Sequence, residues 1–290
     1  MLSTADNEKL TRVGPGTPMG DLMRRYWQPV LLAREVAEPD SDPVRVRILA
    51  EDLVAFRDTT GRVGLISERC PHRLTSLFLG RNEQNGLRCV YHGWKFDVDG
   101  NCIEMPNEPE VSNFQDKVKA LSYAVVEQGG VIWAYLGPKE LQPPPPNFEW
   151  TLVPETHRSV SRVWQECNWM QALEGGIDTS HSSFLHNNDL SDKTLLRSRS
   201  TAPILEVEQT GYGYTYSSTR PLSADEGNYV RTYHYVLPFH QLRAGQVGRS
   251  GEQVWPRRRP PPPPRRPRAG RRPSHRAGFP AGRRRSAYPN

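Results

Sequence analysis

Short runs of apolar and β-branched residues, separated by turns, occupy much of the first half of the chain. Val44–Leu49 and Leu53–Arg57 have the composition of strands, and the Asp-Gly sequence within Asp97–Asn101 suits a turn. Tyr123–Gly137 reads as a hairpin around its central Gly-Gly pair. This pattern predicts a small all-β domain over residues 26–140.

Different patterns flank this domain. Residues 1–25 form an N-terminal arm, and a short helix is expected to begin near Gly20 and to stop before Pro29. Residues 141–152 contain four consecutive prolines, Pro143–Pro146. Such a run favours extended polyproline structure and indicates a stiff linker.

The region 153–248 mixes helical and strand patterns. Its strands are expected in 211–218 and 229–239, where aromatic and polar residues alternate. A helix that loosens at Gly175 and Gly176 is expected from apolar residues near helical spacing: Trp169, Met170, Leu173 and Ile177. We therefore predict an α+β fold: the small all-β domain, then the N-terminal part of a domain with an antiparallel sheet and helices.

Charge is unevenly distributed. Of 38 basic and 32 acidic residues, 13 arginines and one acid, Glu252, lie from Arg249 onward, so the remaining chain holds 25 basic and 31 acidic residues. The net charge of +6 therefore reflects the tail, and the body does not suggest nucleic-acid binding. The Pro- and Arg-rich tail, 249–290, is expected to be disordered. A shifted reading frame explains its composition better than the alternative, a basic RNA- or membrane-binding segment.

Nothing in the sequence indicates export or a membrane. The N-terminus is polar, without the apolar core of a secretory signal, and no run of about 18 apolar residues exists. Four cysteines in 290 residues do not make a disulfide framework. We expect a cytoplasmic protein with reduced thiols, in which Cys102 and Cys167 are small buried apolar residues.

Two short loops carry a candidate metal site. Cys70-x-His72 and Cys89-x2-His92 each combine one thiol with one imidazole, and sixteen residues lie between them. Zinc fingers normally group their cysteines in one pair and their histidines in another. Mixed loops let both cysteines bind one iron and both histidines the other, as in a Rieske [2Fe–2S] cluster. A zinc knot, or structural cysteines with incidental histidines, are the alternatives.

A second, weaker motif is Asp178-x2-His181-x4-His186. Asp178 and His181 are three residues apart, and we expect them to share a helix face that His186 joins one turn later. Two histidines and a carboxylate with open positions can hold non-haem Fe(II). Surface or core histidines, with Asp178 as a helix N-cap, are the alternative.

Together the two motifs resemble the large subunit of the Rieske non-haem iron aromatic-ring oxygenases. The resemblance runs from "GTPMGDLMRRYWQPVLLA" to "YVLPFHQLR", within residues 14–243, and the first stretch is similar to the phthalate 4,5-dioxygenase branch. It implies that NADH supplies electrons through a separate flavin and iron–sulfur reductase to a cluster on the four ligands of the two loops. O2 would then be activated against a small aromatic substrate at a mononuclear Fe(II).

The resemblance also implies individual roles. His181 and His186 would hold the mononuclear iron, and Asp178 would connect it with the cluster of a neighbouring subunit, so that relatives form trimeric rings. The family takes its carboxylate ligand from beyond "YVLPFHQLR", where this chain has its tail. We therefore expect impaired turnover. The rival hypothesis is a Rieske electron-transfer protein without chemistry of its own, and a zinc-binding interaction module is the third.

Overall fold

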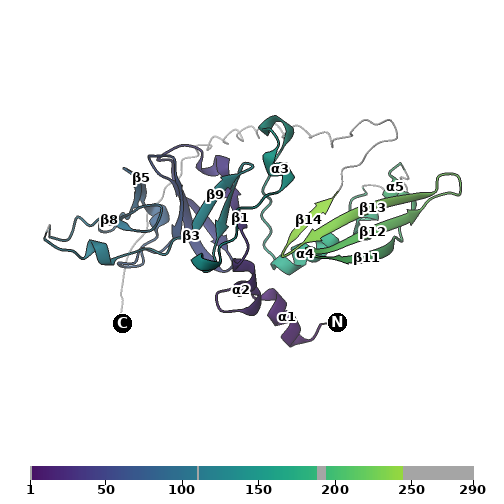
Figure 1. The fold of residues 1–290 in the computed structure, drawn as a ribbon, viewed down its shortest axis with the longest axis horizontal. Coiled ribbons are helices and arrows are strands. Elements are labelled where there is room, and N and C mark those ends of the chain that lie inside the picture. The colour runs from purple at the N-terminus through teal and green to yellow at the C-terminus, as the bar shows by residue number, and fades with distance from the viewer. Residues whose placement is uncertain (1, 110, 188–193, 244–290) are drawn as a thin grey trace, which may run out of the picture. The chain divides into compact units, whose positions relative to one another are not determined.

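Short antiparallel strands dominate the computed structural model, which describes residues 2–109, 111–187 and 194–243 (Figure 1). The α-helices are α1 Thr4–Thr11, α2 Pro18–Arg24, α3 Glu149–Leu152, α4 Trp169–Ile177 and α5 Leu196–Arg199. The strands are β1 Gln28–Leu32, β2 Val44–Ile48, β3 Glu51–Arg57, β4 Val63–Ser67, β5 Arg81–Glu83, β6 Gly86–Arg88, β7 Lys95–Phe96, β8 Cys102–Glu104, β9 Ala124–Gln128, β10 Val131–Tyr135, β11 Ile204–Thr210, β12 Gly213–Pro221, β13 Asn228–Val236 and β14 His240–Arg243.

Three small sheets make up the N-terminal β module, which spans β1 to β10. Their strand orders are β1-β10-β9, β2-β3-β4 and β5-β6-β7-β8. The two strands expected at 44–49 and 53–57 are β2 and β3, which pair antiparallel. The expected hairpin is β9–β10, and Gly129 and Gly130 at its turn both have positive φ. This part of the strand pattern is confirmed.

The N-terminal arm contains two helices rather than one. The hydroxyl of Thr17 caps α2 by accepting from the backbone N–H of Gly20 at 3.2 Å, and α2 ends at Arg24, ahead of Pro29 as expected. Pro29 itself lies in β1, at the edge of its sheet and next to an irregularity in register. An edge strand tolerates a residue that cannot donate to the ladder. The sequence pattern missed both β1 and α1.

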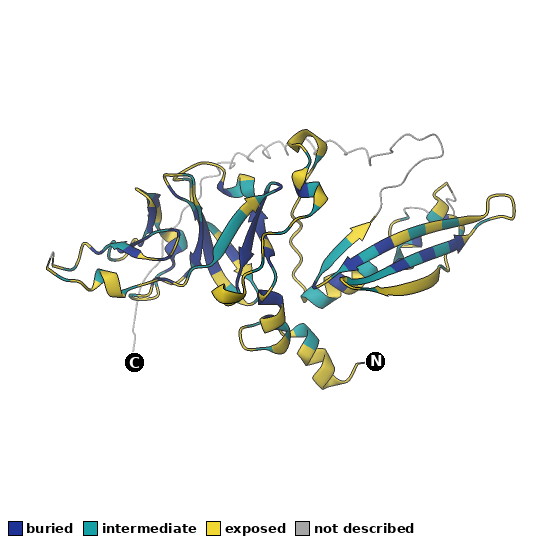
Figure 2. Ribbon diagram, viewed as in Figure 1, coloured by how far each residue is buried: buried dark blue, intermediate teal, exposed yellow. Residues whose placement is uncertain are grey.

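The C-terminal sheet has the strand order β11-β12-β13-β14, antiparallel throughout. Burial alternates along parts of β12 and β13 (Figure 2), where Tyr216 stacks on Tyr233 with ring centroids 4.6 Å apart. The strands expected at 211–218 and 229–239 are present. The edge strand β11 leaves the apolar side chains of Ile204 and Val207 exposed.

Helix α4 continues to Ile177, so the expected loosening at Gly175 and Gly176 is wrong. The glycine at 176 has a packing role instead. A Cβ there would lie 2.1 Å from the side-chain oxygen of Gln241, whose amide donates to the carbonyl of Leu173 at 3.0 Å. Because Gly176 has no side chain, β14 can pack directly against α4.

Two further expectations have different outcomes. Cys102 is buried, as predicted, but Cys167 is exposed, because it lies just before α4 and outside the hydrophobic core. Within the described ranges, no helix is long and apolar enough to cross a bilayer. The tail at 249–290 lies outside the described residues.

An aromatic cluster surrounds His240 of β14. Its ring centroid lies 4.7 Å from that of Phe148, 4.5 Å from Phe239 and 6.4 Å from Trp133. Burial lowers the pKa of His240 to about 4. A neutral imidazole packs well in this environment, whereas a charged one would lose its hydration.

We expect this packing to make stability depend on pH. The unfolded chain protonates His240 near pH 6.5 and the folded chain only near pH 4, so the unfolded state gains as the pH falls through that window. Lowering the pH from 7.5 to 5 should therefore reduce the free energy of unfolding by about 2 kcal/mol through this residue. Urea unfolding of His240→Leu should show that much less pH dependence than the parent. The exposed His157→Leu serves as the control, and equal slopes for His240→Leu and the parent would refute the prediction.

Two candidate metal centres

The two Cys-His loops share one backbone design. Cys70 N–H bonds to the carbonyl of Thr75 and its carbonyl accepts from Leu74; in the same way Cys89 N–H bonds to Trp94 and its carbonyl accepts from Gly93. In each loop the residue four positions after the cysteine has positive φ, +58° and +76°. The equivalence seen in sequence therefore extends to the fold.

The two Cys-His loops pack against the buried hydrophobic core of the N-terminal β module. Cys70 and Cys89, the cysteines of the two loops, belong to that core, being 1% and 3% exposed, and so does Cys102. Its larger apolar members come from β3, β4, β6 and β7 and the loops beside them: Val54, Phe56, Ile66, Leu77, Leu87, Trp94, Phe96, Val98 and Met105. A packed base of this kind fixes the positions from which the two loops project.

The four expected cluster ligands lie as two like pairs. Burial, and after it the adjacent Cys89 sulfur, raise the pKa of the Cys70 thiol to about 11. The rings of His72 and His92 meet at an angle of 60°, with centroids 4.4 Å apart. Two thiols side by side and two imidazoles side by side match a dinuclear cluster with one iron on each pair.

His72 provides a direct test of fit. Its Nδ1 atom is buried and has no hydrogen-bond partner among the described residues, and burial lowers the pKa of the ring, followed by the effect of nearby His92. A buried imidazole nitrogen without a partner is costly unless something else binds it. A neutral ring with a free lone pair is what a metal ion requires.

Trp94 also belongs to this candidate site, although the Cys-His motif gives no sign of it. Its indole ring stacks on His72 with centroids 4.4 Å apart and planes only 8° apart. The indole N–H donates to the side-chain oxygen of Asn107 at 2.6 Å, which fixes the ring. Trp94 therefore sets the orientation of His72. The only signal in the sequence is its place in "HGWKF", immediately after the second loop.

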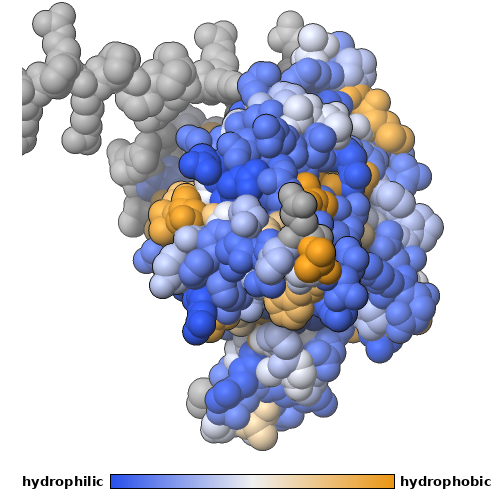
Figure 3. All heavy atoms as spheres, turned by 90° about the vertical axis from the view of Figure 1, so that its left-hand side faces the viewer, coloured by the Kyte–Doolittle hydropathy of each residue, from blue (hydrophilic) through white to orange (hydrophobic). Residues whose placement is uncertain are grey.

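Exposed apolar side chains surround the loops. Leu74, Val90 and Tyr91 are 66%, 52% and 62% exposed. Figure 3 views the end of the molecule that carries β5 and β8, where a few hydrophobic groups interrupt a hydrophilic surface. The two Cys-His loops thus carry a small group of exposed apolar side chains.

Asp178 begins the second centre, though not on the helix that the sequence suggested. It is the C-cap of α4, and His181 starts a separate 3-10 turn, His181–Ser183. The Asp178 carboxylate accepts from the backbone N–H groups of Ser180 at 2.7 Å and His181 at 3.3 Å. The shared helix face was wrong because these local bonds end one helix and start the next. Asp178 is not the N-cap of that turn, which is Ser180, although its carboxylate accepts from the backbone N–H groups at the start of the turn.

The three residues still converge. Asp178 Oδ2 lies 3.1 Å from His181 Nδ1, and His181 Nε2 lies 3.2 Å from His186 Nε2. Two nitrogen ligands about 2.1 Å from one metal ion, at roughly a right angle, would be about 3 Å apart. The two Nε2 atoms therefore fit a shared ion, and Asp178 binds the opposite nitrogen of His181. In the described ranges, no third His, Cys, Asp or Glu joins them closely enough to complete a three-ligand group.

The Asp178 carboxylate is held ionised. Burial raises its pKa, but the backbone N–H of Ser180 and the ring and N–H of His181 together outweigh burial, so the net shift is downward. A carboxylate on Nδ1 keeps the proton there and leaves Nε2 with its lone pair. This is the arrangement that a metal-binding histidine needs.

A cavity of about 330 Å³ opens beside these histidines. Three arginines line it, Arg197, Arg231 and Arg243, and none of them was singled out from the sequence. Arg197 donates to the His186 carbonyl at 3.0 Å, yet its buried Nε has no partner among the described residues. The residues that line the cavity thus combine two imidazoles with an excess of positive charge.

Comparison with known proteins decides the family. The Rieske [2Fe-2S] domain model matches residues 26–115, and the model described as "LigXa C-terminal domain like" matches residues 134–245. Each match contains one of the two centres. The chain belongs to the Rieske oxygenase family. This Rieske oxygenase chain is 47% identical over 251 residues to the phthalate 4,5-dioxygenase oxygenase subunit of Pseudomonas putida, which covers 82% of the chain and 57% of that relative.

A second relative supports the same family assignment. The 3-chlorobenzoate-3,4-dioxygenase oxygenase subunit of Comamonas testosteroni is 44% identical over 248 residues, 83% of this chain and 57% of the relative. The Rieske oxygenase chain thus spans little more than half the length of these two relatives. The crystal structure of dicamba monooxygenase bound to dicamba has the same fold, with a TM-score of 0.63 at 22% identity, over 76% of this chain and 66% of that one.

Removing the charge of Asp178 should weaken metal binding at the second centre of this Rieske oxygenase chain. In Asp178→Asn the amide no longer holds the proton on His181 Nδ1 as strongly. We expect the affinity for Fe(II) at His181 and His186 to fall about 10- to 100-fold. Anaerobic titration measures it, with cluster content as the internal control. Unchanged affinity would show that Asp178 does not orient His181, and loss of the cluster would assign it a structural role.

Proposed function

We propose that the chain is the oxygenase component of a Rieske-type aromatic hydroxylase. The observation that carries this proposal is the convergence of His181 Nε2 and His186 Nε2 at 3.2 Å, with Asp178 on the far side of His181. An electron carrier needs the Cys-His loops and has no use for such a pair. The carrier remains the second candidate, because the two loops alone would satisfy it.

Each residue has a separate task in this proposal. Cys70, Cys89, His72 and His92 would hold the [2Fe–2S] cluster, and His181 and His186 would hold Fe(II). Iron bound at the second site would supply the activation of O2. Asp178 keeps the proton on His181 Nδ1, so that Nε2 faces the metal position, and Trp94 holds the ring of His72.

Electrons would reach the cluster from NADH through a separate flavin and iron–sulfur reductase. The exposed apolar side chains beside the cluster loops, Leu74, Val90 and Tyr91, support a protein contact at this tip. We propose that a neighbouring subunit of a homo-oligomeric, trimeric ring brings its own loops to Asp178. The half-exposed carboxylate, which is 47% exposed, leaves room for that approach.

The substrate class proposed is a small aromatic acid. Arg197, Arg231 and Arg243 line the cavity beside the iron ligands, and a guanidinium group recognises a carboxylate in a planar, bidentate way. Arg231 and Arg243 also lie over the Tyr233 ring, at 5.2 and 5.6 Å from its centroid. Relatives named for phthalate and chlorobenzoate act on molecules of this class.

The test uses nitric oxide as a probe of the second iron. The chain is loaded anaerobically with Fe(II), exposed to NO and examined by EPR. We expect a ferrous–nitrosyl signal that phthalate or 3-chlorobenzoate alters and that neutral toluene leaves unchanged. Absence of the signal in a chain with a full cluster would favour the electron carrier. A signal that toluene alters and the acids do not would contradict the proposed substrate class.

A further inference from the structure

Arg220 of β12 is a buried charge that the proposed chemistry does not use. It is 1% exposed, and no carboxylate among the described residues forms an ion pair with it. Charged side chains are rarely buried without a partner of opposite charge, because desolvation is costly. An arginine kept in such a place therefore needs an explanation in its hydrogen bonds.

Those bonds run mostly to the segment that carries the second metal centre. Nη2 donates to the carbonyl of Thr179 at 2.8 Å and to the hydroxyl of Ser183 at 3.3 Å. Nη1 donates to the hydroxyls of Ser218 at 2.8 Å and Thr179 at 3.3 Å. Thr179 and Ser183 lie on either side of His181, within the stretch between Asp178 and His186.

The same guanidinium also reaches the segment behind the cavity. Nε donates to the carbonyl of Ser200 at 3.0 Å, and Ser183, one of its acceptors, donates to the carbonyl of Arg197 at 2.8 Å. One planar guanidinium on β12 therefore bonds both to the segment 179–183, here called the histidine turn, and to the end of α5. A planar fork of five donors can do this at fixed angles, whereas a lysine ammonium cannot.

We propose that Arg220 is a positioning residue for the two-histidine metal site. By holding the backbone before His181 and the side chain after it, Arg220 fixes the turn from which the His181 ring projects. It also braces Ser183, three residues before His186. The inference rests on the proposed metal site and adds to it a residue that touches neither the metal nor the substrate.

The test is cobalt(II) binding to the full chain, followed by the visible absorption of the bound ion. The portion lost in His181→Ala defines binding at the site. Arg220→Lys keeps the charge but not the fork, and Arg220→Met removes both. We expect the cobalt affinity to fall at least tenfold in both variants, with altered absorption bands, while the EPR signal of the reduced cluster stays unchanged.

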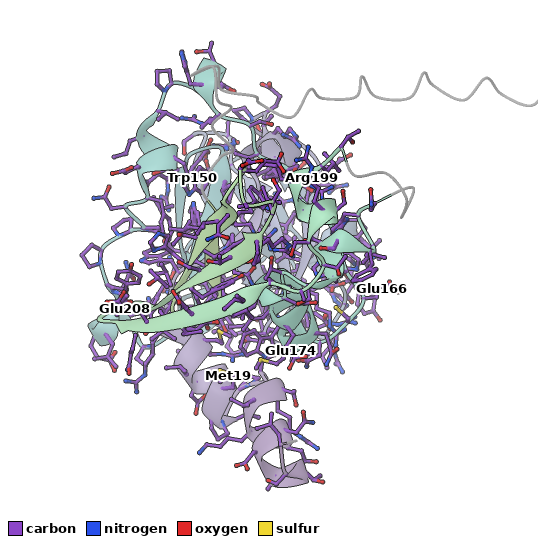
Figure 4. All side chains as sticks on the ribbon, turned by 90° about the vertical axis from the view of Figure 1, so that its right-hand side faces the viewer. Met19, Trp150, Glu166, Glu174, Arg199 and Glu208 are labelled. Carbon is purple, nitrogen blue, oxygen red and sulfur yellow. The ribbon has the colours of Figure 1, made fainter. Side chains whose placement is uncertain are left out.

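Arg199→Met is the matched control. Arg199 (Figure 4) lies on α5 and pairs with Glu226, so its loss should change the cobalt affinity less than twofold. Parental affinity and bands in folded Arg220→Lys and Arg220→Met would overturn the proposal, even if both variants melt at lower temperature. Affinity kept by lysine alone would overturn the role of the fork.

If the Arg220 variants do not fold, a milder substitution tests the positioning role of Arg220. Ser183→Ala removes one acceptor of the guanidinium and should lower the affinity about threefold, whereas unchanged affinity would overturn the proposal. Failure of the proposed function looks different. If the parent chain binds no cobalt at His181 and His186, the metal site itself is refuted, not only its brace.

Discussion

Replacing His72 with cysteine should lower the reduction potential of the cluster by roughly 100–300 mV. Histidine ligation places Rieske centres near −150 to +300 mV, against about −400 mV for clusters held by four cysteines. A thiolate adds negative charge where a neutral imidazole had none, and so disfavours the reduced state.

Protein-film voltammetry of the parent and of the variant measures this shift. His92→Cys should move the potential in the same direction. His157→Cys is the matched control, because it adds a thiol at an exposed position outside both loops. An intact cluster with the parental potential in His72→Cys would show that this histidine is not a ligand.

Loss of either histidine at the second centre should nearly abolish metal binding there. His181→Ala or His186→Ala leaves one imidazole where two now converge at 3.2 Å. We expect Fe(II) affinity to fall more than about 100-fold, beyond the range for a lost orienting partner. Iron analysis after anaerobic loading should then give two irons per chain rather than three.

The cluster provides the reference within the same molecule. Its two irons and its absorption spectrum should not change in either alanine variant. His234→Ala, on β13 and bonded to Tyr212 at 3.1 Å, is the control for a generic histidine loss. Three irons per chain in His181→Ala would place the third iron elsewhere and contradict the site.

The sequence predicted the N-terminal β module better than the arm before it. Strands β2, β3, β9 and β10 follow from alternation and turn residues, because nearly all of their pairings are to neighbours in sequence. The exception is β1, which pairs with β10 at separations of 99 to 106 residues and contains Pro29. A distant pairing of that kind leaves no local signal in the chain.

The candidate centres show the same division. Spacing singled out the four cysteine and histidine candidates and the Asp178 motif, since short loops fix those relations. Spacing could not reveal that Trp94 stacks on His72, or that Arg220 reaches the histidine turn across about forty residues of sequence. It also misplaced Asp178 on one helix with His181, because side-chain capping, not periodicity, decides where that helix ends.

The central claim is that the two loops hold a [2Fe–2S] cluster with two histidine ligands. The most direct test is pulsed EPR of the dithionite-reduced chain, purified anaerobically, with iron and acid-labile sulfide determined on the same sample. The claim predicts two irons and two sulfides at this centre and hyperfine coupling to two imidazole nitrogens, lost singly in His72→Cys and His92→Cys. A colourless chain with one zinc per molecule, or a cluster without nitrogen coupling, would contradict it.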